Sequence, residues 1–237
     1  MISFELNGKK YSSPKGWENI TFEKFLKYLS EVAPNTPEIL KELFEAENLA
    51  EAWNNYNDKD KLICYKFFAL SVGFWCGLPA EEIKESMNIE QLESAFFTIE
   101  IDLANMQNDD TFTGFEIKGK RYVLPAENME GSTVSEFAEA SQFQENLSEV
   151  EGGEWLSMLD VMVVLCRPEG EKYSYDKNRH ELRKKLFKGL SMDKVINSAF
   201  FLLRQNVELQ NNLLIYSMLQ EIAQKQEKQL KKLMVGI

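Results

Sequence analysis

Two apolar segments dominate the pattern of hydrophobic and polar positions along the chain. Residues 62–76 and 155–166 are apolar around most of a helical circumference, which is typical of helices buried at the centre of a domain. Each segment ends at a helix breaker, Gly77 followed by Pro79 in the first and Pro168 in the second. The pattern therefore predicts one central core helix in each half of the chain.

A β-hairpin is predicted ahead of each core helix. The dipeptide Asn7-Gly8 stands between apolar and polar residues, and it is the strongest short-range hairpin signal because a type I′ turn requires positive φ at both central positions. The dipeptide Lys118-Gly119 is a weaker version of the same turn. We expect both halves to begin with two short antiparallel strands.

Helix starts follow both hairpins. Thr21 is placed to cap a helix, and Thr133 with Glu136 forms a capping-box pattern. A further helix is expected at Pro37 in the first half, whereas the second half has the acidic, glycine-containing loop 145–154 in its place. Each half is then expected to end in a last amphipathic helix.

The two halves also resemble each other in sequence. Residues 4–14 match residues 115–125 with six identities at a constant offset of 111, and three further pairs of short blocks follow in the same order. We therefore predict an α+β, mainly α-helical fold, in which a unit made of a β-hairpin followed by three or four helices is duplicated in tandem, with an extended C-terminal helix. The predicted domains are the first repeat unit 1–110, the second repeat unit 111–203 and a C-terminal helical extension 204–237.

Composition places the chain among ordinary globular proteins. Of its 237 residues, 44% are hydrophobic and 27% are charged, which excludes an intrinsically disordered chain. The apolar stretches are shorter than the roughly 20 residues of a membrane helix, and the first residues lack the features of a secretory leader. We therefore expect a chain that is neither exported by a signal peptide nor inserted in a membrane.

The three cysteines, Cys64, Cys76 and Cys166, are an odd number at wide spacing, which indicates reduced core residues.

Residue patterns that could carry catalysis are weak throughout the chain. Residues 114–121 have most of a Walker A spacing, but Arg121 occupies the Ser or Thr position and a strand follows, so we interpret them as part of the hairpin. His180 is the only histidine, no two cysteines have zinc spacing, and a nucleophilic Cys166–His180 pair would use a cysteine that ends an apolar helix. We therefore expect a non-enzymatic protein with no catalytic, cofactor-binding or metal-binding residues, no cofactor and no small-molecule substrate.

Charge is distributed unevenly along the chain. The net charge is −11, from 27 basic and 38 acidic side chains. Residues 1–110 hold 20 acidic and 10 basic side chains, whereas residues 172–237 hold 6 acidic and 13 basic ones. The densest basic cluster is preceded by Tyr173 and Tyr175. It comprises Lys177, Arg179, Arg183, Lys184, Lys185 and Lys188.

Three interpretations of this basic cluster stay open. It could bind an acidic partner protein, it could bind nucleic acid, or it could pair with the chain's own acidic loop. We favour a protein partner over nucleic acid, because the acidic remainder of the chain repels a phosphate backbone. The candidate partner-binding residues are the six basic residues named above together with Glu145, Glu149, Glu151 and Glu154 of the acidic loop.

The hairpin and cap residues carry a resemblance to a class of known proteins. The pattern is formed by Phe4, Asn7, Gly8, Lys9, Tyr11, Pro14, Trp17, Thr21 and Phe25, and it is repeated in part over residues 115–137. It resembles small structural and assembly proteins of tailed bacteriophages, particularly those infecting Bacteroidetes. The resemblance implies a head-tail connector, ring or tail component of the virion, or an assembly factor such as a tail assembly chaperone. It also implies a location in the cytoplasm of the infected bacterial cell or in the virion. No binding residues carry over, because the resembling positions are turn, cap and core residues.

The sequence therefore supports two functional hypotheses. The first is an interaction protein that assembles with itself into a ring or spiral, or with other virion proteins, by placing the basic end of one copy against the acidic face of the next. The alternative is an intracellular regulator or inhibitor whose acidic surface mimics nucleic acid.

Overall fold

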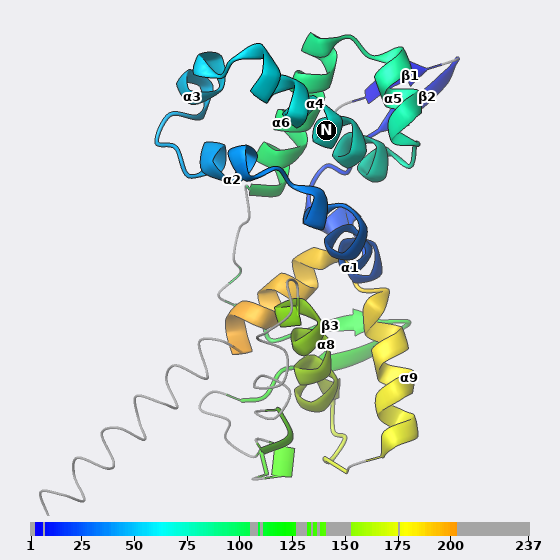
Figure 1. The fold of residues 1–237 in the computed structure, drawn as a ribbon. Coiled ribbons are helices and arrows are strands. Elements are labelled where there is room, and N and C mark those ends of the chain that lie inside the picture. The colour runs from blue at the N-terminus through cyan, green and yellow to red at the C-terminus, as the bar shows by residue number, and fades with distance from the viewer. Residues whose placement is uncertain are drawn as a thin grey trace, which may run out of the picture.

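The chain folds into two small units that meet at a helix near the N-terminus. The computed structural model describes residues 3–6, 8–104, 109, 111–126, 132–133, 135–136, 138–140, 153–174 and 176–202. The described part is mainly helical with two small antiparallel sheets, which confirms the α+β, mainly α-helical class. Figure 1 shows the first unit (residues 3–104) above, the second unit (residues 111–202) below, and helix α1 between them.

The first predicted hairpin is present. Strands β1 (Ser3–Leu6) and β2 (Lys9–Ser12) pair antiparallel, with Phe4 opposite Tyr11. The two aromatic rings stack with their centroids 6.0 Å apart. Gly8 has a φ of +75°, the left-handed value that the turn signal required.

The second hairpin repeats the register of the first at the same sequence offset. Strands β3 (Gly114–Ile117) and β4 (Lys120–Val123) pair with Phe115 opposite Tyr122, and their rings stack with centroids 5.8 Å apart. The second sheet has one addition, because β5 (Arg167–Pro168) pairs with the free side of β4. The hairpins are thus alike, while the duplication of the complete units stays a prediction.

Helix α4 (Asp58–Cys76) is the core helix of the first unit. It begins four residues before the predicted segment, because the side chain of Asn57 accepts a hydrogen bond from the Asp60 N–H and caps the helix there. It ends where expected, at Gly77 with a φ of +75°. Phe68 of α4 is fully buried and stacks on Phe96 with a centroid separation of 3.9 Å.

The other helices of the first unit surround α4. Three of them, α2, α3 and α5, are only seven residues long, and α3 and α5 were not expected from the hydrophobic pattern. The set comprises α1 (Phe22–Glu31), α2 (Glu38–Phe44), α3 (Leu49–Asn55), α5 (Ala80–Ser86) and α6 (Ile89–Ala104). Among the described residues no single helix has both the length and the apolar character of a membrane span. Helices α4 and α5 taken together have the length and the apolar composition of a membrane span, but the chain bends by 110° between them.

The second unit is built around helix α8 (Gly153–Leu165), the predicted core helix. Helix α9 (Lys177–Lys188) packs against α8, and residues 192–202 form one more helical stretch. The last two residues of the predicted acidic loop, Gly153 and Glu154, belong to α8. The rest of that loop, and the predicted C-terminal extension over residues 204–237, lie outside the described residues.

The two units are joined by a short antiparallel bridge between two helix starts. The Phe22 N–H donates to the Leu190 carbonyl over 2.7 Å, and the Met192 N–H donates to the Ile20 carbonyl over 2.8 Å. Helix α1 begins immediately after the first of these segments, and helix 192–202 begins within the second. The same order of residue types occurs on both sides: an apolar residue, Thr or Ser, an apolar residue, an acid and Lys.

Aromatic side chains close the junction around this bridge. Phe25 of α1 contacts Trp155 of α8 edge-to-face with centroids 5.2 Å apart, and it contacts Trp17 in the same manner at 5.3 Å. The indole N–H of Trp17 donates to the Leu103 carbonyl at the end of α6 over 2.6 Å. Helix α1 is therefore held by the core side chains of both units.

The aromatic core of the first unit makes a direct prediction. Replacing Phe68 by Ala removes a stacked ring from a fully buried site and leaves a cavity, so we expect the free energy of unfolding to fall by about 3–5 kcal/mol. Urea denaturation followed by circular dichroism measures this. The control is Leu62→Ala on the same helix, whose side chain is 58% exposed and should change stability by less than about 1 kcal/mol. Equal losses for the two variants would contradict the assignment of the core.

Candidate partner-binding surface

Helix α9 carries the basic cluster and begins at a well-formed cap. The carboxylate of Asp176 accepts hydrogen bonds from the N–H groups of Asn178 and Arg179, at 3.0 and 3.2 Å. Lys185 and Lys188 lie in the last turn, where positive charge is favoured by the helix dipole. Local sequence thus stabilises the helix that presents the cluster.

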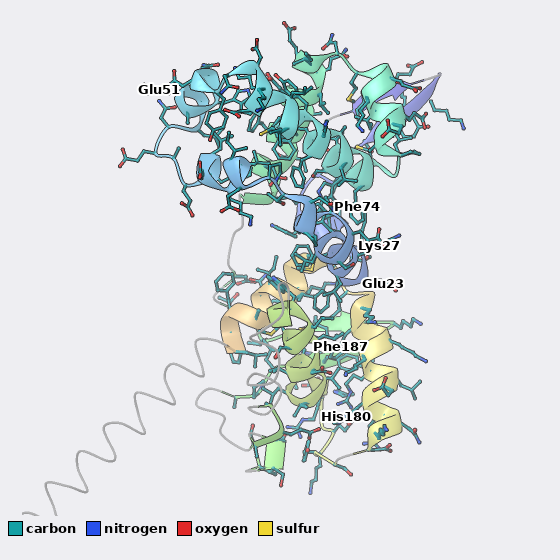
Figure 2. The ribbon with its side chains drawn as sticks, viewed as in Figure 1. Glu23, Lys27, Glu51, Phe74, His180 and Phe187 are labelled. Carbon is teal, nitrogen blue, oxygen red and sulfur yellow. The ribbon has the colours of Figure 1, made fainter. Side chains whose placement is uncertain are left out.

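The inner face of α9 is buried in the second unit. His180, Arg183 and Phe187 recur at helical spacing on this face, and Figure 2 labels His180 and Phe187 along the helix. The Phe187 ring contacts Phe115 and Tyr122 of the second hairpin edge-to-face, with centroids 5.4 and 5.3 Å apart. The hairpin therefore fixes the rotation of α9 about its own axis.

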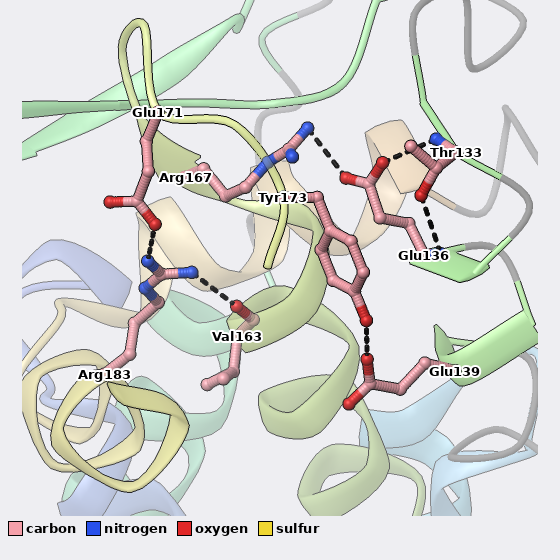
Figure 3. A network of polar contacts seen from close by, with 8 residues as sticks. All are labelled: Thr133, Glu136, Glu139, Val163, Arg167, Glu171, Tyr173 and Arg183. Atoms are coloured by element: carbon pink, nitrogen blue, oxygen red, sulfur yellow. Dashed lines mark hydrogen bonds and ion pairs between the residues drawn. The ribbon is translucent and has the colours of Figure 1, made fainter. Parts of the chain in front are cut away.

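Arg183 is held inside the unit by two acceptors. Its guanidinium donates to the Val163 carbonyl of α8 over 3.1 Å and to the Glu171 carboxylate over 2.6 Å (Figure 3). Its side chain is only 7% exposed. A buried guanidinium needs such partners, because the cost of removing it from water is otherwise not recovered. Arg183 was predicted to bind a partner, and the structure instead engages it within the chain.

A second buried ion pair stabilises the same region. The Arg167 guanidinium lies 2.7 Å from the fully buried carboxylate of Glu136. The other oxygen of Glu136 accepts from the Thr133 N–H, and the Thr133 hydroxyl accepts from the Glu136 N–H, so the predicted capping box is formed (Figure 3).

The single histidine belongs to this structural network. The His180 Nδ1 lies 3.5 Å from a Glu139 oxygen. Figure 3 shows the Tyr173 hydroxyl, which donates to the other oxygen of that carboxylate. Cys166 is fully buried, and burial raises the pKa of its thiol to about 12 although Arg183 and Arg167 act in the opposite direction. The thiol is therefore protonated at neutral pH and poorly suited to act as a nucleophile.

The outer face of α9 presents the remaining basic residues. Lys177 and Lys185 are exposed and Lys188 is half-buried, and within the part of the chain that the structure describes none of the three forms an ion pair. Arg179 is exposed and lies 3.4 Å from Glu171, whereas Lys184 is half-buried and pairs with Asp160 of α8. The six predicted residues are thus divided between two sides of one helix.

A residue that the charge pattern did not single out lies at the centre of this outer face. Leu182 is 68% exposed, the largest exposed fraction among the large hydrophobic side chains described. Arg179 and Lys185 lie three residues before and after it, on the same side of the helix. The sequence signal for it was an isolated apolar residue in a highly charged helix.

The structure does not describe the side chains of the four predicted acidic residues, so it shows none of them beside α9. Glu145, Glu149 and Glu151 lie outside the described residues, and Glu154 is described only as part of the α8 backbone. The carboxylates that meet α9 come instead from Asp160, Glu139 and Glu171. Internal charge pairing therefore occurs, but the described part of it uses acids outside the predicted loop.

A second polar cluster, missed by sequence analysis, lies inside the first unit. Burial raises the pKa of Glu100 on α6 to about 7. Burial also raises the pKa of Tyr28 to about 12, helped by the Glu100 charge and opposed by a hydrogen bond to Ser71. The Tyr28 ring stacks on Trp75 at 4.7 Å. In the described residues no group of three or more His, Cys, Asp or Glu side chains could hold a metal ion.

Removing the buried guanidinium of Arg183 should lower the stability of the fold. For Arg183→Ala we expect the free energy of unfolding to fall by about 3 kcal/mol, because Glu171 and the Val163 carbonyl lose their donor in a poorly hydrated site. Lys177→Ala on the same helix is the matched control, because Lys177 is exposed, and it should stay within about 0.5 kcal/mol of the parent protein. Urea titrations compare the two variants, and a tolerant Arg183→Ala would contradict a structural role.

Glu100 predicts a pH-dependent stability. Its folded-state pKa lies above the ordinary value of 4.5, so the folded chain holds this proton more tightly and stability falls as pH rises from 4.5 to about 7. Glu100→Gln stays neutral, so it should raise the free energy of unfolding by about 2 kcal/mol at pH 8 and change it little at pH 4. Urea titrations at the two pH values test this, with Glu85→Gln at an exposed position of α5 as control. An equal effect at both pH values would contradict it.

Comparison with known proteins finds no family model, no curated protein and no solved structure that matches the chain. The resemblance to tailed-phage proteins stays a prediction, which rests on the hairpin and cap residues of the two units. The surface is therefore described by its geometry: α9 buries His180, Arg183 and Phe187 on one face and exposes basic residues around Leu182 on the other.

Proposed function

We propose that the chain is a non-enzymatic interaction protein that assembles with copies of itself or with other proteins of a virus particle. The observation that carries the proposal is the outer face of α9, where Leu182 is exposed to solvent between Arg179 and Lys185. Leu182 with its flanking cations supplies the two parts of a small contact surface, an apolar centre and a charged rim.

The distribution of charge supports contacts between copies. The first unit is strongly acidic, and three of its lysines already pair with neighbouring glutamates on their own helices: Lys27 with Glu31, Lys41 with Glu38, and Lys84 with Glu81. A basic face at one end and an acidic unit at the other favour a head-to-tail arrangement, which closes into a ring or continues as a spiral.

The assignment to a particular kind of virion or assembly protein is based on the sequence. The tandem duplication and the resemblance to tailed-phage structural and assembly proteins support a head-tail connector, a ring or tail component, or a tail assembly chaperone. Such proteins act through surfaces and need no reactive group, which agrees with the structural use of His180 and Cys166. A location in the infected bacterial cell or in the virion belongs to the same proposal.

The acidic first unit also supports the second candidate, a regulator or inhibitor that mimics nucleic acid. Residues 1–110 hold twice as many acidic as basic side chains and no arginine. Charge reversal separates the two candidates. Reversing Glu145, Glu149, Glu151 and Glu154 should abolish target binding by a mimic, whereas assembly should respond more strongly to reversal of Lys185.

Self-association is the property to measure. Light scattering coupled to size-exclusion chromatography should give a mass above that of one 27.5 kDa chain at about 0.02 M salt, and a lower mass at about 0.5 M salt, because salt screens contacts between exposed charges. A monomer at both salt concentrations that also co-purifies with no virion protein would contradict the proposal.

A further inference from the structure

A groove lies on the first unit between the first hairpin and the start of helix α6. It has a volume of about 380 Å³ and is lined on one side by β1 and on the other by the end of α5 and the first turns of α6. Its apolar lining residues include Phe4, Met87 and Ala95, and its acidic lining residues are Glu5, which lies opposite Lys10 across the hairpin, and Glu90. None of the described residues that line it is a lysine or an arginine, so the groove combines apolar side chains with acidic ones.

Both walls of the groove are held in place by the fold. Phe4 is fixed by its stack on Tyr11 across the hairpin. The start of α6 is fixed by a reciprocal cap, in which the Gln91 N–H donates to the Asn88 side chain over 2.8 Å and the Asn88 N–H donates to the Gln91 side chain over 3.1 Å. A groove with rigid walls loses little conformational entropy when a side chain enters it.

The outer face of α9 has the complementary chemistry. It places one exposed leucine, Leu182, between two cations at a spacing of three residues. The apolar lining at Phe4 and Met87 suits a leucine side chain, and the two carboxylates suit Arg179 and Lys185. On α9 the cations outnumber the single acid of this turn, Glu181, and Arg179 also lies near Glu171, so Lys185 is the cation that the described residues leave without an ion pair.

The two surfaces cannot meet within one chain. Figure 1 shows the hairpin and α5 at the far side of the first unit, α9 along the second unit, and α1 between the two. Helix α1 and α9 are held on each other by the bridge between Phe22 and Leu190, so this separation is built into the fold. A contact between α9 and the groove therefore requires a second copy of the chain.

We infer that the groove formed by β1, α5 and α6 is the docking site for helix α9 of a neighbouring copy, with Leu182 entering the groove and Arg179 and Lys185 facing Glu5 and Glu90. This inference rests on the proposed function, since it assigns the surfaces through which self-assembly occurs. The contact joins two different surfaces, so each copy keeps one donor helix and one groove for further copies.

Sedimentation velocity over a concentration series tests the contact at the level of single residues. Leu182→Asp and Glu90→Lys are each expected to weaken self-association at least tenfold. The swap that combines Lys185→Glu with Glu90→Lys should recover most of the lost affinity, because the two charges are exchanged across the contact. The matched control is Leu62→Asp, a comparably exposed leucine on α4 outside the groove, which should associate like the parent protein.

Disulfide trapping tests the direction of the contact. Mixing a Leu182→Cys chain with a Met87→Cys chain should give a cross-linked pair on a non-reducing gel, whereas one chain carrying both cysteines should give a ladder of higher species. Cross-linking of Leu182→Cys with itself would indicate a symmetric contact and overturn the inference. Circular dichroism of each variant confirms that it is folded.

The outcomes distinguish this inference from the proposed function. If the parent protein self-associates but Leu182→Asp and Glu90→Lys leave the association unchanged, the docking site is wrong and self-assembly stands. If the charge swap associates no better than Glu90→Lys alone, the pairing across the contact is wrong. If the parent protein is a monomer under all conditions, the docking site and self-assembly fail together.

Discussion

The arrangement of the whole molecule depends on the antiparallel bridge between two helix starts. Two backbone hydrogen bonds, from Phe22 to Leu190 and from Met192 to Ile20, join segments about 170 residues apart in the sequence. Each segment feeds directly into a helix, so the bridge sets the direction in which both helices leave the junction. Phe25 and Trp155 then bury the junction from both sides. Because the loop that is closed is long, this contact costs chain entropy that the surrounding aromatic packing offsets.

The functional proposal follows from which side of α9 the fold buries. Arg183 and His180 face α8 and the acids around it, and Phe187 packs on the second hairpin, so rotation of the helix is fixed. The opposite side must then carry Leu182 and Lys185 into solvent. A buried ion pair is weak evidence for stability but good evidence for orientation, since a guanidinium finds matching acceptors in only one position. Because of this orientation, only part of the basic cluster is exposed, and the exposed cations lie next to Leu182.

Local sequence signals were reliable where a single short-range interaction decides the structure. The turn at Gly8, the cap at Thr21 and the capping box of Thr133 and Glu136 all occur as expected, because each depends on residues within a few positions. The short helices α3 and α5 were missed, since seven residues hold too little periodicity, whereas the equally short α2 was expected from the start signal at Pro37. Glu100 was missed for another reason: an acid in a helix gives no sign of its burial until the neighbouring helices are placed.

The sequence by itself determined the helical class, the two hairpins, the core helices α4 and α8, and the segregation of charge, because these depend on periodicity, turn chemistry and composition. Only the tertiary structure decided which charges are available. Arg183 and Lys185 are two residues apart in one basic run, yet one is inside an ion pair and the other in solvent. Residues two apart on a helix point in directions about 200° apart, and only the packing of α9 on α8 determines which of those directions is the interior.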